Sequence, residues 1–200
     1  CSAAEDLQDA KKLCKQLSIP LHHINFTKEY RENVFENFLN EYKKGRTPNP
    51  DILCNREIKF GVFKSHAERL GAEFIATGHY AKIKRGNGAL KLFKSKDKNK
   101  DQTYFLYAVE PKNFKNTIFP LADITKEEVR AIAQANGLIN YKKRDSTGIC
   151  FIGKRPFKEF LGSYIPSEPG NIIDRNGTIV GVHDGLMFHT IGQRQGLNIG

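Results

Sequence analysis

The chain has 200 residues, of which 39% are hydrophobic, and its 32 Lys and Arg against 22 Asp and Glu leave a formal net charge of +10. No run approaches the ~20 apolar residues of a membrane span and no signal peptide opens the chain, so we expect a cytoplasmic protein with no membrane partner. The basic excess favours a polyanionic partner through counterion release, although plain solubility explains the same charge equally well.

The first half of the chain predicts alternating helices and strands. A capping box at residues 2–5 starts a helix whose inner face carries Leu7, Ala10, Cys14 and Leu17. Residues 20–24 read as a short strand. Thr27 is placed to cap a second helix, which ends at Gly45 and whose inner face carries Tyr30, Val34, Phe38 and Tyr42.

Two prolines then keep residues 46–53 extended, and a helix that ends at Gly71 follows. Residues 73–77 read as a buried strand, and residues 81–94 as a hairpin that turns at residues 86–88. This order predicts an α/β fold with a doubly wound parallel sheet.

The second half of the chain changes pattern. A capping box at residues 125–128 starts a helix that closes at Gly137, Pro156 starts a short helix, and residues 171–182 read as two strands. We place a domain boundary near residue 115, with a first α/β domain over 1–115 and a smaller mixed α+β central domain over 116–200.

Four cysteines, Cys1, Cys14, Cys54 and Cys150, lie far apart. Because none forms a Cys-x-x-Cys pair, the spacing predicts no metal site, and a reducing compartment argues against structural disulfides. Cys14 lies on a helix face and is expected to pack in the core.

Cys54 follows Asp51 by three residues, where the extended segment meets a helix. A cysteine in the first turn of a helix feels the positive end of the helix dipole, which lowers its pKa, and Asp51 could move protons. The alternative, that Asp51 caps the helix and Cys54 packs, is equally compatible with the pattern.

Cys150 lies between Gly148 and Gly153 in a basic stretch that includes Lys142, Lys143, Arg144 and Lys154. Cationic neighbours stabilise a thiolate or persulfide anion, and the glycines let the segment bend. This context favours a reactive thiol over a buried structural cysteine.

Two shorter stretches are candidates for ligand contact. Gly78-His79 follows a strand, where ligands of parallel sheets bind, although a common turn has the same composition. Lys100-Asp101-Gln102 offers groups that can read bases or phosphates; the alternative is a solvated turn. The aromatic residues at 104–107 are expected to lie in the core.

Five stretches taken together resemble the bacterial tRNA-specific 2-thiouridylase family, in the family's order: residues 47–55, 76–80, 100–106, 145–153 and 189–194. The resemblance implies a nucleotide-binding domain of the adenine nucleotide alpha hydrolase, or pyrophosphatase-loop, type. It also implies that segment 140–153 folds back toward the catalytic site. The family's Ser-Gly-Gly-x-Asp-Ser phosphate loop would precede residue 1 and its C-terminal β-barrel would follow residue 200, so we expect a fragment with an incomplete sheet.

The resemblance also implies a reaction, namely sulfur transfer to C2 of the wobble uridine in the tRNAs for Lys, Glu and Gln. ATP, a substrate used with Mg²⁺ and without a tightly bound cofactor, would adenylate the uridine O2. The sulfur would come from a persulfide donor such as a cysteine desulfurase or a sulfur-relay protein.

Residue roles follow from the same resemblance. Cys150 would carry the persulfide, Cys54 would act as the nucleophile and form a disulfide with Cys150, and Asp51 would be the acid/base. Gly78 would contact ATP. The flipped base would be framed by Asn49, Pro50 and Asp51, and other tRNA contacts would come from His79, Lys100, Asp101 and Gln102. Two alternatives stay open: a tRNA-binding fragment without catalysis, and another pyrophosphatase-loop ligase, which has no need of two thiols.

Overall fold

The computed structural model of the chain describes residues 3–86, 89–143, 145, 148–153, 155–197 and 199. Several positions named above lie outside the described residues, namely Cys1, Ser2, Asn87, Gly88, Arg144, Ser146, Thr147 and Lys154. Among the described residues, no helix is both long enough and apolar enough to cross a membrane.

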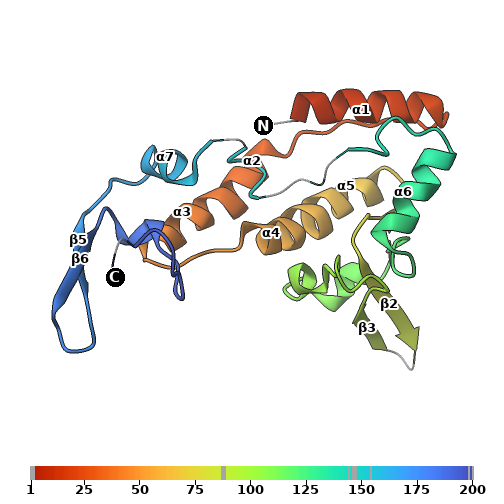
Figure 1. The fold of residues 1–200 in the computed structure, drawn as a ribbon. Coiled ribbons are helices and arrows are strands. Elements are labelled where there is room, and N and C mark those ends of the chain that lie inside the picture. Colours follow the sequence, from red (N-terminus) through yellow and green to blue (C-terminus); the bar gives the residue numbers. More distant parts are fainter. Residues whose placement is uncertain are drawn as a thin grey trace.

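Two helical runs precede the predicted extended segment. The first helix, α1, spans Ala3–Gln16 and carries a half-buried Cys14. The second run is continuous and consists of α2 (Thr27–Tyr30), the π-helical turn η1 (Arg31–Phe35) and α3 (Glu36–Lys43) (Figure 1). It ends at Gly45, as predicted, in the left-handed conformation with φ +69°. The predicted cap was wrong, because the Asn25 side chain accepts the Thr27 N–H at 2.8 Å.

The predicted strand over residues 20–24 is not formed, and residues 19–26 have no regular structure. A strand needs a neighbour for its backbone N–H and C=O groups, and no described strand pairs with this segment. Leu21 and Ile24 consequently remain 41% and 37% exposed.

The third helical run consists of α4 (Pro50–Leu53), η2 (Cys54–Phe63) and α5 (Lys64–Arg69). The Asn49 side chain accepts the Asp51 N–H at 3.2 Å, and Pro50 occupies the first helical position, where a missing N–H leaves no bond unmade. The extended segment therefore ends at Asn49 rather than at residue 53, and Asn49 is the cap instead of Asp51.

The strands form three two-stranded sheets among the described residues. β1 (Ile75–Ala76) pairs in parallel with β4 (Thr117–Ile118), and β2 (Ala81–Gly86) pairs antiparallel with β3 (Ala89–Lys94). β5 (Gly170–Ile173) pairs antiparallel with β6 (Ile179–His183). The fold is thus mixed α/β, with one parallel pair of strands among the described residues, and the wider doubly wound sheet stays a prediction.

The remaining elements are short except for one helix. They are η3 (Thr103–Leu106), η4 (Pro111–Phe114), α6 (Lys126–Ala135), α7 (Phe157–Gly162) and η5 (Leu186–Phe188). The capping box predicted for α6 is confirmed, because Thr125 and Glu128 bond each other's backbone N–H. After α6 the chain returns along α1 toward α7 (Figure 1). This part, from residue 136 to residue 156, is called the returning segment below.

Two hydrophobic clusters hold these elements together. The hairpin cluster packs under β2 and β3 and contains Phe60, Ile75, Ala81, Leu106, Val109, Phe114, Phe119 and Ala122. The helix cluster joins α3 to α7 and contains Phe38, Tyr42, Ile152, Phe160, Leu161, Ile165 and Met187. Because Ile152 belongs to the helix cluster, the segment that carries Cys150 is anchored two residues beyond that cysteine.

Candidate active site

Residues that are far apart in the sequence meet around Tyr30. The Tyr30 hydroxyl lies 3.5 Å from Cys150 Sγ. Burial, this hydrogen bond and the nearby negative charges of Cys150, Cys54 and Asp51 raise the pKa of Tyr30 above its usual range. The two thiols and the carboxylate named from the sequence are therefore neighbours, Cys54 and Asp51 on the α4–η2 helix and Cys150 on the returning segment.

The environment of Cys54 differs from the prediction. Burial raises the pKa of the Cys54 thiol, Lys59 opposes the rise, and Cys150 and Asp51 add to it. The predicted lowering by the helix dipole was wrong, because Asn49 is the cap and Cys54 lies beyond the first turn, where the dipole effect has faded. These effects together favour the neutral form of the Cys54 thiol.

A pocket of about 800 Å³ opens beside Cys150. Aromatic side chains make up much of its wall, including Phe26, Phe35, Phe151 and Phe160. A pocket of several hundred Å³ with an apolar wall and few polar groups suits a planar ring such as a nucleobase.

Gly78 lies two residues beyond the end of β1, at the carboxyl end of the parallel pair, and is exposed. A Cβ atom there would meet only Leu121, 3.9 Å away. A ligand can therefore reach this backbone closely, which is the property that a nucleotide contact requires.

His79 is buried, and both of its ring nitrogens have partners. Nε2 lies 3.1 Å from Asn55 Oδ1, and Nδ1 lies 2.8 Å from Thr77 Oγ1. Because the Asn55 amide nitrogen donates to the Phe105 carbonyl, Asn55 Oδ1 must accept from His79, which assigns the proton to Nε2. Burial and the nearby Lys59 charge lower the pKa of His79 to about 4. His79 is therefore a neutral interior residue that links β1, η2 and η3, and its predicted contact with tRNA stays a prediction.

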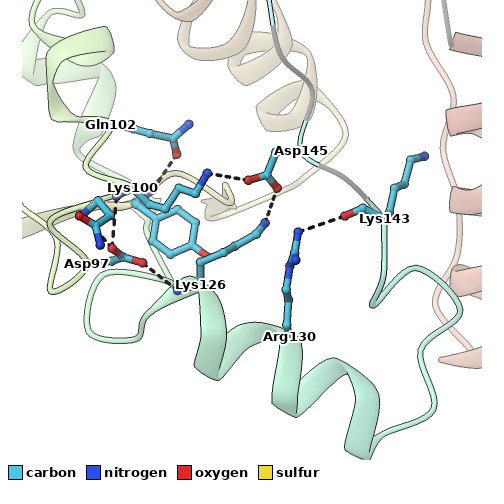
Figure 2. A network of polar contacts seen from close by, with 9 residues as sticks. Asp97, Lys100, Gln102, Lys126, Arg130, Lys143 and Asp145 are labelled. Atoms are coloured by element: carbon cyan, nitrogen blue, oxygen red, sulfur yellow. Dashed lines mark hydrogen bonds and ion pairs between the residues drawn. The ribbon is translucent and has the colours of Figure 1, made fainter.

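Lys100 reaches the returning segment through an ion-pair network (Figure 2). Lys100 Nζ lies 2.7 Å from Asp145 Oδ2, and Lys126 Nζ lies 2.8 Å from Asp145 Oδ1. The hydrogen bonds from Lys100 and Lys126 lower the pKa of Asp145 to about 2. Asp145 thus ties the chain that leads to Cys150 onto the loop before η3 and onto the start of α6.

The described lysines before Cys150 do not gather around its sulfur, which corrects the prediction. Lys143 Nζ pairs with Asp6 at 2.7 Å and with Asp9 at 2.6 Å, both on α1. Lys142 lies over the Tyr141 ring, 5.3 Å from its centroid. Their charges hold the segment in place instead of stabilising the thiolate.

Asp101 and Gln102 shape the loop beside Lys100. The Gln102 side chain accepts the Tyr80 N–H at 3.0 Å, and Asp101 accepts the Thr103 N–H at 3.3 Å. The expectation that the aromatic residues at 104–107 lie in the core was wrong for Tyr104 and Tyr107, which are 64% and 69% exposed.

Tyr30 is the site residue that the sequence did not single out. It lies one and two helical turns before Val34 and Phe38, both fully buried, and was therefore assigned to a packing face. No local signal separates a tyrosine that packs from one that touches a sulfur across 120 residues.

Comparisons with known proteins identify the domains of the chain. Residues 1–154 match the family described as tRNA methyl transferase HUP domain, and residues 158–200 match the tRNA methyl transferase PRC-barrel domain. The chain therefore consists of a HUP domain followed by a PRC-barrel domain. The two matches meet near residue 156, whereas the boundary predicted from the sequence near residue 115 stays a prediction, and β4 beyond that boundary pairs with β1.

Curated relatives named tRNA-specific 2-thiouridylase MnmA are similar to the whole chain. Identity is 58% over 200 residues with that of Legionella pneumophila strain Paris, and 57% over 201 residues with that of Francisella tularensis subsp. holarctica strain LVS. It is 56% over 200 residues with that of Halalkalibacterium halodurans. The matches cover 100% of this chain and 55%, 56% and 54% of those relatives, so the chain spans about half their length. The chain belongs to the tRNA-specific 2-thiouridylase family.

Proposed function

We propose that this chain supplies the sulfur-transfer centre of an enzyme that 2-thiolates tRNA, a transferase that consumes ATP. The observation that carries the proposal is the meeting of Cys54, Asp51 and Cys150 around one tyrosine. A structural cysteine has no need of a second thiol and a carboxylate beside it.

In the proposed reaction the wobble uridine of the tRNAs for Lys, Glu and Gln is first activated as an adenylate at O2, because oxygen on C2 is otherwise a poor leaving group. ATP is a substrate of this step, and the exposed backbone at Gly78 suits its approach. Mg²⁺ would accompany ATP as a co-substrate. Among the described residues, no group of three or more His, Cys, Asp or Glu is placed to hold a metal ion.

Sulfur transfer then proceeds in two bond exchanges. The terminal sulfur of a Cys150 persulfide bonds to C2 as the C2–O2 bond breaks, and AMP departs with the electron pair. The Cys54 thiolate next attacks Cys150 Sγ, so that a Cys54–Cys150 disulfide forms and the electron pair of the broken S–S bond stays on the sulfur at C2. A thiol reductant restores both cysteines, which are free in the structure.

The proton on Cys54 must leave before that attack, because burial keeps this thiol neutral. Asp51 is the proposed acceptor, since its charge acts on the Cys54 thiol. Asn49 and Pro50 precede it at the start of α4 and would frame the extruded base, which costs little to extract from an unpaired anticodon position.

Contacts with the rest of the tRNA are proposed for the 100–102 loop and its surroundings. Lys100 is exposed and charged and suits a phosphate. Direct tRNA contacts are also proposed for Asp101, Gln102 and His79, although these side chains bond within the protein as well and support the loop in that way. The persulfide would come from a cysteine desulfurase or a sulfur-relay protein.

The test uses the full-length protein with ATP, unmodified tRNA and a persulfide donor, and it measures 2-thiouridine in nuclease digests by mass spectrometry. Cys150→Ser and Cys54→Ser are expected to abolish the product while tRNA binding persists, and Cys14→Ser is the matched control that keeps activity. Thiolation by Cys150→Ser would overturn the proposal.

The two alternatives have their own signatures. A tRNA-binding fragment without catalysis would bind tRNA and release no AMP, so ATP-dependent AMP release by this 200-residue chain excludes it. Another pyrophosphatase-loop ligase would keep its activity after the thiols are alkylated.

A further inference from the structure

We infer that Tyr30 is a further catalytic residue, whose hydroxyl donates a hydrogen bond to the Cys150 sulfur and stabilises it as an anion. The inference rests on the proposed function, because it treats Cys150 Sγ as a reacting atom. Within the described part of the chain, Cys150 Sγ forms a side-chain hydrogen bond with the Tyr30 hydroxyl, at 3.5 Å.

The helix that carries Tyr30 holds this hydroxyl in place. Val34 and Phe38, one and two turns further along the same face, are 0% exposed and fix the rotation of the helix. The Tyr30 ring packs edge-on against Phe151, with centroids 6.0 Å apart. Because Phe151 follows Cys150 directly, this contact also fixes the distance between the hydroxyl and the sulfur.

Among the described residues, the surroundings of Cys150 make the Tyr30 donor important. Much of the wall around Cys150 is aromatic, and the guanidinium of Arg155 lies over the Phe160 ring at 4.8 Å. Lys142 and Lys143 are engaged elsewhere. Cys150 itself is exposed, and a hydrogen bond from Tyr30 to its anionic sulfur is roughly twice as strong as one between neutral groups.

Tyr30 acts in this role as a donor and not as a base. Burial, the hydrogen bond to Cys150 and the charges of its neighbours raise the Tyr30 pKa above its usual range, so the phenol keeps its proton at neutral pH. The described titratable and charged groups around this point come from several elements. The pocket wall contributes His23, Arg31, Arg155 and Tyr164. The α4–η2 helix contributes Asp51, Cys54 and Lys59.

The test is the alkylation of Cys150 by iodoacetamide in the full-length protein, followed for the Cys150 peptide by mass spectrometry at a series of pH values. Tyr30→Phe removes the hydroxyl and keeps the ring. We expect its alkylation at pH 7 to be about tenfold slower and its pH profile to move to higher pH.

Tyr42→Phe is the matched control, because Tyr42 lies three turns further along the same helix face, is buried, and contacts Phe38 instead of Cys150. Its alkylation profile should match that of the parent protein. A Tyr30→Phe profile identical to the parent profile would overturn the inference.

A second variant removes any ambiguity from misfolding. A difluorotyrosine at position 30 keeps the shape and makes the phenol a stronger donor, so the profile should move to lower pH. A residue that only packs would not shift the two profiles in opposite directions. Alkylation needs neither ATP nor tRNA, so this inference can fail while Cys150→Ser still abolishes thiolation, and the proposed function can fail while the alkylation shifts remain.

Discussion

The buried His79 should make the stability of this protein depend on pH in a way that can be calculated. Its pKa is lowered from 6.5 to about 4 in the folded chain. Between these values the unfolded chain binds a proton that the folded chain does not, so stability falls as pH falls from 6.5 toward 4. With these pKa values, acidification from pH 7.5 to pH 5 costs about 2 kcal/mol of unfolding free energy through this residue alone.

The assay is urea unfolding at pH 7.5 and at pH 5 for the parent protein and for His79→Gln. Glutamine does not titrate, and its amide can still donate to Asn55 Oδ1. The other five of the 6 histidines are common to both proteins, so their contributions cancel in the comparison. We expect the parent to lose about 2 kcal/mol more than the variant on acidification. An equal loss in both would show that His79 is not kept neutral by its buried network.

Three further predictions follow from single contacts. Lys100→Ala should weaken tRNA binding and reduce the slope of log affinity against log salt by about one, measured by anisotropy. Lys112→Ala, which removes a lysine paired with Glu110, is the control and should leave the slope unchanged. Asp145→Asn should speed hydrogen exchange across residues 148–153 with a stability loss of about 1 kcal/mol or less, and the parent should show the same loosening only as pH falls toward 2, since the Asp145 pKa is about 2. Phe38→Ala should cost about 3–5 kcal/mol in urea unfolding because Phe38 is fully buried, and a loss below about 1 kcal/mol would contradict its place in the helix cluster.

The features that the sequence predicted well are those decided by neighbouring residues. Gly45, Gly71 and Gly137 follow predicted helices and adopt φ of +69°, +88° and +62°. The capping box at Thr125 and Glu128 forms as expected. In each case the interacting residues lie within about four positions of each other. The sequence around a helix end therefore contains the whole interaction.

The features that the sequence failed to predict depend on residues that are distant in the chain. Residues 20–24 have strand composition, but among the described residues no strand pairs with them. The basic residues near Cys150 suggested a cationic pocket, but Lys143 turns to Asp6 and Asp9 on α1. Composition states which charges are available and leaves open where a long side chain finds its counterion.

The Cys54 environment shows a third kind of error. The helix-dipole argument was valid, but the helix begins a few residues earlier than predicted. The dipole argument needs Cys54 in the first helical turn, and the helix begins at Pro50. Burial then dominates and raises the Cys54 pKa. Helix starts are among the hardest boundaries to predict, and a shift of one turn reversed the sign of the expected pKa change.

The two sulfurs of the proposed site are held in different ways, and the difference suits their roles. Cys54 lies within a helix and faces a fixed surrounding, whereas Cys150 lies on an irregular segment tied by Asp145, whose side chain is 34% exposed, and by the Tyr30 hydroxyl. Exposed ion pairs contribute about 0.2–1 kcal/mol each, so opening the Asp145 contacts costs little. Ile152 in the helix cluster limits how far the opened segment can travel. In the proposed reaction, Cys150 receives sulfur from a donor outside the pocket and delivers it to the uridine inside the pocket. A weak tie on one side of Cys150 and an apolar anchor on the other suit this proposed role, because the segment could open at Asp145 while Ile152 keeps Cys150 near Cys54.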